Sequence, residues 1–382
     1  MQTAIAPIRM VDLIGQYQKI KPEIDQALLD IMDRAAFING PEVKQFQANL
    51  EKYLAVKHVI PCANGTDALQ ICMMALGLKP GDEVITACFT YVATAEVIAL
   101  LGLKPVLVDV DPMTFNINPA QIEAAITPNT KAIVPVHLFG QCADMEAIIN
   151  IAKKHNLYII EDTAQAIGSD YIFADGHSCK AGTMGQMGAT SFFPSKNLGC
   201  FGDGGAIFTN DDELASKARM ICNHGQSRLY YHDEIGVNSR LDTMQAAILD
   251  IKLKHLDEYN TARKNAATYY DKAFANHPNI KAPHRAANST HVFHQYTLQT
   301  CGIDRNELKK YLEENKIPAM IYYPVPLNQQ KAYIQEGSFP VTEQLCNCVI
   351  SLPMHSELSE EQLSYITNTV LNSIKKIVNS NQ

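Results

Sequence analysis

The chain has 382 residues, ample for two domains, and its 47% hydrophobic and 19% charged residues are typical of a globular protein rather than a disordered or fibrous one. Its 32 Lys and Arg residues against 40 Asp and Glu residues give a net charge of −8, which argues against the positive field that holds a nucleic acid. No apolar run is long and uninterrupted enough to predict a membrane span, so we expect neither nucleic acid nor a membrane as a partner.

The first part of the chain alternates segments of helical periodicity with short, continuously apolar segments. The predicted elements, in chain order, are helices at 22–34 and 41–54, a strand at 58–63, a helix at 66–77, a strand at 82–87, a helix at 92–102, a strand at 105–110, a helix at 118–126, a strand at 131–139, a helix at 145–155 and a strand at 158–165. Apolar strands that alternate with helices predict an α/β fold with a mostly parallel sheet covered on both faces.

The pattern changes near residues 250–260. The elements expected from there are a long helix over 241–259, a second helix over 259–274, a strand over 291–301, a helix over 304–316 and a final helix after Leu358. This order is typical of a smaller α+β domain. We therefore expect a large domain over 1–255 and a small C-terminal domain over 256–382.

The N-terminus and the cysteines predict a cellular compartment. The segment MQTAIAPIRMVDLIGQYQKI lacks a basic region followed by an apolar core and a cleavage site. The ten cysteines form no CxxC unit, as expected of reduced and mostly buried thiols. Cys346 and Cys348 are the one close pair, and no His or Cys cluster accompanies them, so we expect no metal site. A cytoplasmic protein is expected.

Three candidate sites follow apolar runs, where open parallel sheets bind their ligands. Gly65 turns the chain into a helix at Thr66 and Asp67, whose free amides suit a phosphate, although a plain helix cap explains the same residues. Asp162 ends the run YIIE and can keep a cationic ring nitrogen protonated, with a helix cap as the alternative. Lys196 follows a β-like run and precedes four glycines, which suits a buried amine of lowered pKa that forms a Schiff base.

Two further patterns narrow the chemistry. The glycines after Lys196 match neither GxGxxG nor GxxxxGK[ST], which weakens a dehydrogenase or ATPase interpretation. Asn238 and Arg240 enter the helix expected at 241–259, where Asn238 is a candidate cap. Arg240 is either a surface charge or a bidentate ligand of a phosphate or carboxylate.

Four segments together resemble the nucleotide-sugar aminotransferases of the DegT/DnrJ/EryC1/StrS family. They are NGTDAL, EDTAQAIG, SFFPSKNLG followed by GDGGAIFTND, and GVNSRLDTMQAAIL, in this order. The resemblance covers nearly the whole chain. It implies the aspartate-aminotransferase-like fold (PLP fold type I) with a seven-stranded sheet, the cofactor pyridoxal 5'-phosphate, which alternates with pyridoxamine 5'-phosphate, and a homodimer with active sites shared across its interface.

The resemblance also implies roles for individual residues. Lys196 matches the lysine that forms the Schiff base, Asp162 the partner of the pyridine nitrogen, and Gln165 the neighbour of the ring's phenolic oxygen. The other cofactor-binding matches are Gly65, Thr66, Asp67 and Ser191 around the phosphate, Tyr91 stacked on the ring, and Asn238 reaching the phosphate from the other subunit.

The substrate expected by resemblance is a UDP-linked keto-sugar. CANGTDALQI, FGQCADM and YPVPLN most resemble enzymes that use L-glutamate, releasing 2-oxoglutarate, to aminate the 3-keto group of UDP-N-acetyl-3-oxoglucuronate for bacterial O-antigen synthesis. NSRLD also resembles the dTDP-3-keto-6-deoxyhexose aminotransferases. Substrate-binding candidates are Arg240, Tyr322 and Tyr323, and a packed aromatic pair is the alternative for the tyrosines. Tyr322 stands where the hexuluronate enzymes resemble His-Tyr-Pro.

Other functions remain open from the sequence. They are amination of a 4-keto sugar, a lyase or isomerase that uses the same cofactor, and a non-catalytic sugar sensor. The related 3-dehydratases carry histidine where this chain has Lys196, so the resemblance favours amine transfer.

Overall fold

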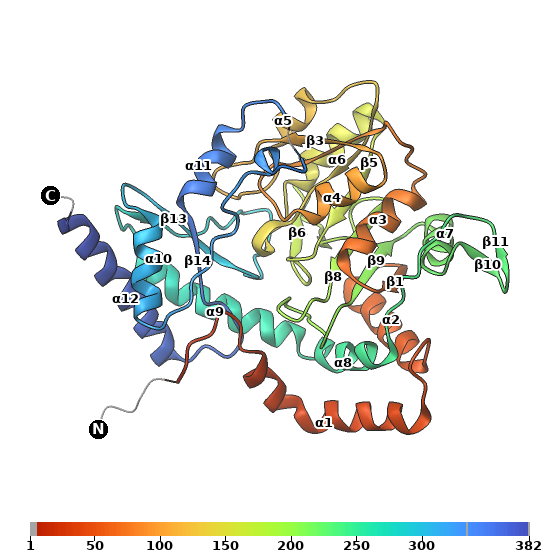
Figure 1. Cartoon of the computed structure of the whole chain (residues 1–382), viewed down its shortest axis with the longest axis horizontal. Coiled ribbons are helices and arrows are strands. Elements are labelled where there is room, and N and C mark those ends of the chain that lie inside the picture. Colours follow the sequence, from red (N-terminus) through yellow and green to blue (C-terminus); the bar gives the residue numbers. More distant parts are fainter. Residues whose placement is uncertain (1–5, 334, 381–382) are drawn as a thin grey trace.

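The computed structural model describes residues 6–333 and 335–380, so the outermost parts of the two expected domains, 1–5 and 381–382, lie outside it (Figure 1). Its main sheet has seven strands in the order β1-β9-β8-β5-β4-β2-β3. Every neighbouring pair is parallel except those that β9 makes with β1 and β8. The strands are β1 (His58–Cys62), β2 (Glu83–Ala87), β3 (Lys104–Val108), β4 (Thr130–Val134), β5 (Tyr158–Asp162), β8 (Met187–Ser191) and β9 (Gly205–Thr209).

Helices cover both faces of this sheet, and the alternation of side chains along each strand decides what each face contacts. In β4, Ile133 packs in the core on one face, and its neighbours Ala132 and Val134 pack on the other. The face of Ala132 is covered by α3 (Gly65–Ala75), α4 (Ala93–Leu100) and α7 (Asp212–Cys222). The opposite face is covered by α2 (Pro41–Leu54), α5 (Pro119–Ala124), α6 (Met145–His155) and α8 (Thr243–Leu253), with α1 (Leu13–Arg34) packed on α8.

A second core surrounds a three-stranded antiparallel sheet. Its strands are β12 (Ile280–Lys281), β13 (Tyr296–Thr300) and β14 (Val349–Leu352), and its helices are α9 (Leu256–Phe274), α10 (Arg305–Glu314), α11 (Pro340–Cys348) and α12 (Glu360–Ser380). Residues near the N-terminus also join this region, because the Gln362 side chain donates to the carbonyls of Ala6 and Pro7 and the Met354 amide donates to Met10. The domain limits 1–255 and 256–382 stay a prediction.

Most expected elements are present, and the bounds expected for 41–54 and 145–155 are those of α2 and α6. The continuous helix over 241–259 is wrong. The amides of Lys254 and His255 bond to carbonyls three residues back, which tightens and ends α8 before α9 begins at Leu256. The strand expected over 291–301 is also shorter, since only Tyr296–Thr300 pairs in the sheet.

Two short hairpins complete the fold. They are β6 (Asp170–Ile172) with β7 (Ser178–Lys180), and β10 (Gln226–Arg228) with β11 (Tyr231–His232), which lies at the outer edge beyond α7 (Figure 1). Leu229, Tyr230 and Ile235 in and beside the second hairpin are strongly exposed. Across the described ranges, every helix is too short or too polar to cross a membrane.

Candidate active site

A cavity of about 850 Å³ opens at the carboxyl ends of the central strands. This is where a parallel sheet places its ligand. The predicted site residues that line it are Gly65, Thr66, Asp67, Tyr91, Asp162, Gln165, Ser191, Lys196, Tyr322 and Tyr323. Segments separated by more than 250 residues in the chain therefore meet around one space, as the sequence predicts.

The turn after β8 fixes the position of Lys196. Its amide donates to the Phe193 carbonyl at 2.8 Å, and the next residue, Asn197, donates from its side chain to Asn260 at 2.7 Å and to the Val292 carbonyl at 3.0 Å. A Cβ on Gly199 would lie 2.4 Å from the Pro194 carbonyl oxygen, so only glycine fits where this turn closes. Lys196 is thus presented from a rigid loop rather than from a mobile one.

The Lys196 amine has a perturbed acidity. Burial lowers the pKa of Lys196 to about 8, and the nearby Asp162 carboxylate opposes part of that change. A sizeable fraction of the amine is therefore neutral near neutral pH. A neutral lysine amine is a nucleophile and a base, which is what Schiff-base chemistry requires.

Asp162, at the end of β5, is held in one orientation. Its side chain is 7% exposed, and its two oxygens accept hydrogen bonds from Thr94 Oγ1 at 2.9 Å and from the Ala164 amide at 3.1 Å. A carboxylate has about four acceptor sites, so capacity remains for a donor inside the cavity. Asp162 can therefore bind a protonated nitrogen of a ligand without losing its own supports.

Gln165 and the tyrosines form a second wall. Gln165 Oε1 accepts from the Phe139 amide at 2.7 Å, which directs Nε2 toward Tyr323 Oη at 3.2 Å. Burial raises the pKa of Tyr323 well above its usual value, so this phenol stays protonated. The ring of Tyr323 lies 6.3 Å from that of Tyr91 and 6.0 Å from that of Tyr322. Tyr91 is 59% exposed, which leaves its ring free to stack on a ligand.

The start of α3 forms the far end of the cavity. Asn64 Oδ1 accepts from the Asp67 amide at 2.8 Å, so Asn64 is the cap that the sequence alternative assigned to Thr66 or Asp67. A Cβ on Gly65 would lie 2.6 Å from the Ser191 Cβ, so glycine is needed for this close approach. The amides of Gly65 and Thr66 precede the first intrahelical donor, Ala68, and suit an anion.

Asn238 and Arg240 do not line the cavity within one chain. Asn238 is exposed and pairs through its backbone with Asn223, and Arg240 is half-buried. The residue between them, Ser239, accepts a hydrogen bond from the Ala63 amide at 3.1 Å and so attaches this segment beside the cavity. Their expected roles remain predictions that depend on a second subunit.

The polar residues of the cavity region that were not predicted include His294, Thr90 and Thr94. His294 lines the cavity, is 5% exposed, and has an Nδ1 atom without a hydrogen-bond partner in the described part of the chain. Burial, then the charges of Lys196 and Arg263, lower the pKa of His294 far below its usual value, so its ring is neutral. Thr90 also lines the cavity, and Thr94 supports Asp162. The sequence pattern could not identify His294, because this residue precedes strand β13 (Tyr296–Thr300) rather than following a strand.

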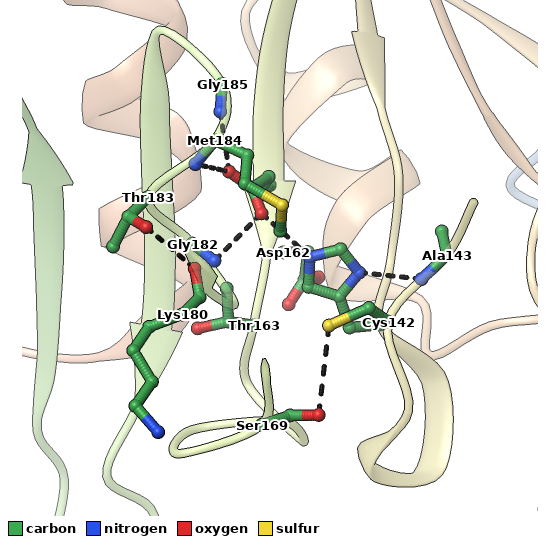
Figure 2. A network of polar contacts seen from close by, with 12 residues as sticks. Cys142, Ala143, Asp162, Thr163, Ser169, Lys180, Gly182, Thr183, Met184 and Gly185 are labelled. Carbon is green, nitrogen blue, oxygen red and sulfur yellow. Dashed lines mark hydrogen bonds and ion pairs between the residues drawn. The ribbon is translucent and has the colours of Figure 1, made fainter. Parts of the chain in front are cut away.

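A buried histidine, His137, lies close in sequence to the cavity residue Phe139 but outside the cavity. Its Nε2 is 2.9 Å from Glu161 Oε2, and its Nδ1 accepts from the Ala143 amide at 3.1 Å in a buried network (Figure 2). It does not line the cavity. Within 6–333 and 335–380, no group of three or more His, Cys, Asp or Glu residues is placed to hold a metal.

The cavity fits a planar ring that carries a phosphate, an aldehyde and a basic ring nitrogen. The α3 amides suit the phosphate, Lys196 the aldehyde, and Asp162 the ring nitrogen. Thr90 Oγ1 is buried without a partner in the described residues, so the cavity has polar capacity that the chain itself leaves unused. Each of these groups suits pyridoxal 5'-phosphate.

Comparison with known proteins agrees with this chemistry. The model of the DegT/DnrJ/EryC1/StrS aminotransferase family matches residues 18–371. A "pleiotropic regulatory protein" of Geobacillus stearothermophilus is 49% identical, covering 95% of this chain and 97% of the relative. The UDP-2-acetamido-2-deoxy-3-oxo-D-glucuronate aminotransferase of Pseudomonas aeruginosa is 47% identical, covering 96% of this chain and 100% of the relative.

The fold also matches solved structures. A DegT/DnrJ/EryC1/StrS aminotransferase from Brucella abortus superposes with a TM-score of 0.91 at 42% identity, covering 96% of this chain and 99% of that one. The fold expectation, PLP fold type I with a mostly parallel seven-stranded sheet, is confirmed. The chain belongs to the DegT/DnrJ/EryC1/StrS aminotransferase family and is a pyridoxal-phosphate-dependent sugar aminotransferase.

Proposed function

We propose that the protein transfers an amino group from L-glutamate to the 3-keto group of a UDP-linked, N-acetylated 3-oxo-hexuronic acid. The carrying observation is the 47% identity, over the full length of the relative, to an aminotransferase named for UDP-2-acetamido-2-deoxy-3-oxo-D-glucuronate. The cavity with Lys196 supports an intact catalytic site. The setting that this substrate implies is cytoplasmic, before O-antigen sugars are assembled.

We propose the following cofactor contacts. Asp162 holds the ring nitrogen, Gln165 the phenolic oxygen, and Tyr91 stacks on the ring. The phosphate lies at the start of α3, bound by Gly65, Thr66, Asp67 and Ser191, with Asn238 from a second copy of the chain. When bound, pyridoxal 5'-phosphate supplies an electron sink, and a protonated ring nitrogen makes that sink stronger.

Lys196 performs the proton transfers in this proposal. Its Nζ would take the proton from the α-carbon of glutamate, hold it beside the bound cofactor, and return a proton when the sugar is aminated. A pKa of about 8 suits both directions, because the amine gains and loses a proton with little cost near neutral pH. The hydrogen bonds of Asn197 hold the turn that carries Lys196 and so orient Nζ toward the cavity.

The substrate contacts involve a second subunit. Lys196 is the only Lys or Arg among the described residues that line the cavity, whereas Asp67, Asp162 and Asp203 are acidic. A nucleotide-linked uronate brings phosphates and a carboxylate, which need further cations. We infer that Arg240 reaches the site across a homodimer interface and that Tyr322 and Tyr323 contact the sugar.

A regulatory function is the second candidate, since a relative at 49% identity bears the name of a regulatory protein. A sensor needs to bind a ligand but does not need proton transfer. We place regulation second because Lys196 and Asp162, the groups that amine transfer needs, line one cavity.

A half-reaction tests the proposal. The protein is converted to its pyridoxamine form with glutamate, the donor is removed, and keto-sugars generated in situ are added while the absorbance of the aldehyde form is followed. We expect recovery with UDP-N-acetyl-3-oxoglucuronate. Recovery only with a dTDP-linked 3-keto or a 4-keto sugar would overturn the substrate, and no conversion with any amino donor would favour the sensor.

A further inference from the structure

A second carboxylate, Glu161, lies next to Asp162 in β5 and is not part of the cavity. Its side chain is fully buried. Oε1 accepts from the amides of Met184 and Gly185, both at 2.6 Å, and Oε2 accepts from the Gly182 amide at 2.8 Å. Figure 2 shows these three amide nitrogens directed toward the same carboxylate, and His137 Nε2 makes the fourth contact at 2.9 Å.

The network fixes the protonation of both partners. His137 Nδ1 accepts from the Ala143 amide, so the ring hydrogen is on Nε2 and is donated to Glu161. Glu161 therefore faces four donors and no acceptor. A protonated carboxyl would have a hydroxyl without an acceptor, so Glu161 is ionised and His137 is neutral. The pair carries one buried negative charge, and no cation cancels it within the network.

This charge has a fixed position relative to Asp162. Consecutive side chains of a strand point to opposite faces, so the two carboxylates flank the β5 backbone. The His137 amide donates to the Asp162 carbonyl at 3.0 Å, and the Asp162 amide donates to the Pro135 carbonyl at 2.9 Å. One segment, 135–137, thus binds the side chain of Glu161 and the backbone of Asp162.

The other titratable groups leave this charge unneutralised. On the side of Glu161 they are His137 and the thiols of Cys142 and Cys179; burial raises the pKa of Cys142 to about 12 and raises that of Cys179. Burial keeps the two thiols uncharged near neutral pH, and His137 Nδ1 accepts from the Ala143 amide and so carries no proton. On the side of Asp162, Lys196 is the only Lys or Arg among the described residues that line the cavity, and Asp67 and Asp203 are further carboxyl groups there. Burial keeps His294 neutral and Tyr323 protonated.

We propose that Glu161 is a positioning residue that places a second fixed negative charge behind Asp162 and so helps to keep the cofactor's ring nitrogen protonated. The proposal rests on the proposed function, in which Asp162 contacts that nitrogen. A unit charge on the order of 10 Å away changes the acidity of a group by about one pH unit at an effective dielectric constant near 20. Asp162 supplies the direct contact, and Glu161 strengthens it through the strand.

The test uses holoenzyme loaded with cofactor that carries ¹⁵N at the ring nitrogen, whose chemical shift reports ring protonation independently of turnover. In Glu161→Gln we expect the pH at which the ring loses its proton to fall by about one unit. Glu161→Asp disturbs the hydrogen bonds but keeps the charge, so its midpoint should stay within a few tenths of a unit of wild type. An unchanged midpoint in Glu161→Gln overturns the proposal.

Two further variants separate the possible failures. Glu83→Gln removes a buried, hydrogen-bonded carboxylate from the other end of the same sheet, and its ring midpoint should match wild type. Asp162→Asn should leave the ring unprotonated; if it does not, the proposed role of Asp162 fails, not only that of Glu161. Because Glu161→Asp keeps the charge, a shift of a full unit in that variant would also overturn the charge effect.

Discussion

The two ends of the main sheet each bury a carboxylate, with different consequences. At the start of β2, Glu83 accepts from exposed Lys104 at 2.9 Å, from Thr127 at 2.5 Å and from Thr130 at 3.3 Å. At the end of β5, Asp162 has two donors from its own chain and lies beside Lys196. Glu83 is satisfied within the fold, whereas Asp162 keeps capacity for a ligand.

The hollows at the two ends are of similar size, so volume does not distinguish them. The one near Glu83, which Thr127 and Thr130 help to line, measures about 700 Å³, and the active-site cavity about 850 Å³. The difference lies in acidity. Thr127 and then Lys104 lower the pKa of Glu83 by binding its charged form. Burial lowers the pKa of Lys196 and so favours the neutral amine. Stability favours paired charges, and catalysis favours a group poised between two states.

Of the changes at the two ends of the sheet, removal of Lys196 should cause the largest loss of activity. Lys196→Ala should lose the absorbance of lysine-bound cofactor and slow the glutamate half-reaction by about 10³-fold or more, because the nucleophile and the proton carrier are the same amine. Stopped-flow absorbance measures both. Lys252→Met is the matched control: Lys252 is also buried with a pKa lowered to about 8, but it donates to the Gly199 carbonyl and does not line the cavity. Equal losses in the two variants would contradict the assignment.

Replacing Asp162 with alanine should impair both cofactor binding and turnover. Asp162→Ala should weaken cofactor retention and reduce turnover by about 10²-fold or more, since the ring nitrogen loses its partner. The measurements are the cofactor dissociation constant and the turnover number with glutamate. Near-normal turnover in Asp162→Ala would count against a contact with the ring nitrogen.

The pKa of Lys196 can be tested through the pH dependence of its reaction with the cofactor. The rate at which apoprotein recovers lysine-bound absorbance after cofactor is added should rise about tenfold per pH unit below the lysine pKa of about 8 and level off above it. Asp162 raises the pKa of Lys196, so Asp162→Asn should move the midpoint to lower pH. A pH-independent rate, or a midpoint that moves upward, would show that another group controls the step.

Glu83→Ala should produce the smallest effect on catalysis and a measurable effect on stability. We expect the free energy of unfolding to fall by about 1–3 kcal/mol while turnover stays within twofold. The pKa of Glu83 is lowered from its reference of 4.5, so its contribution is present above that pH and is lost as the pH falls through the lower value of the folded protein. Urea unfolding at several pH values measures this, and a stability difference that grows in acid would contradict it.

Where chemistry follows a strand, the sequence predicted which residues meet at the cavity, and their roles stay predictions. Asp162, Lys196 and Gly65 come directly after apolar runs or a β-like run, and the structure brings them together. It predicted less where contacts depend on distant packing. Thr94 lies in a mostly apolar segment, and its bond to Asp162 joins the first turn of α4 to the end of β5.

Parts of the fold were hidden for similar reasons. The β-like run before Lys196 marks only the end of β8. The strand's small residues, MGATS, include no continuous apolar run, and burial within the sheet makes this segment a strand. The break between α8 and α9 is invisible because apolar periodicity continues across Lys254 and His255. The roles of Asn238 and Arg240 lie beyond a single chain.

The contacts of Ala6, Pro7 and Met10 with Gln362 and Met354 have a consequence for synthesis. A ribosome makes residues 6–10 long before their partners exist, so these residues wait unpaired while the main sheet, complete by residue 209, can already form. Only the emergence of α12 allows them to dock. A segment that is made early is thus among the last to find its place.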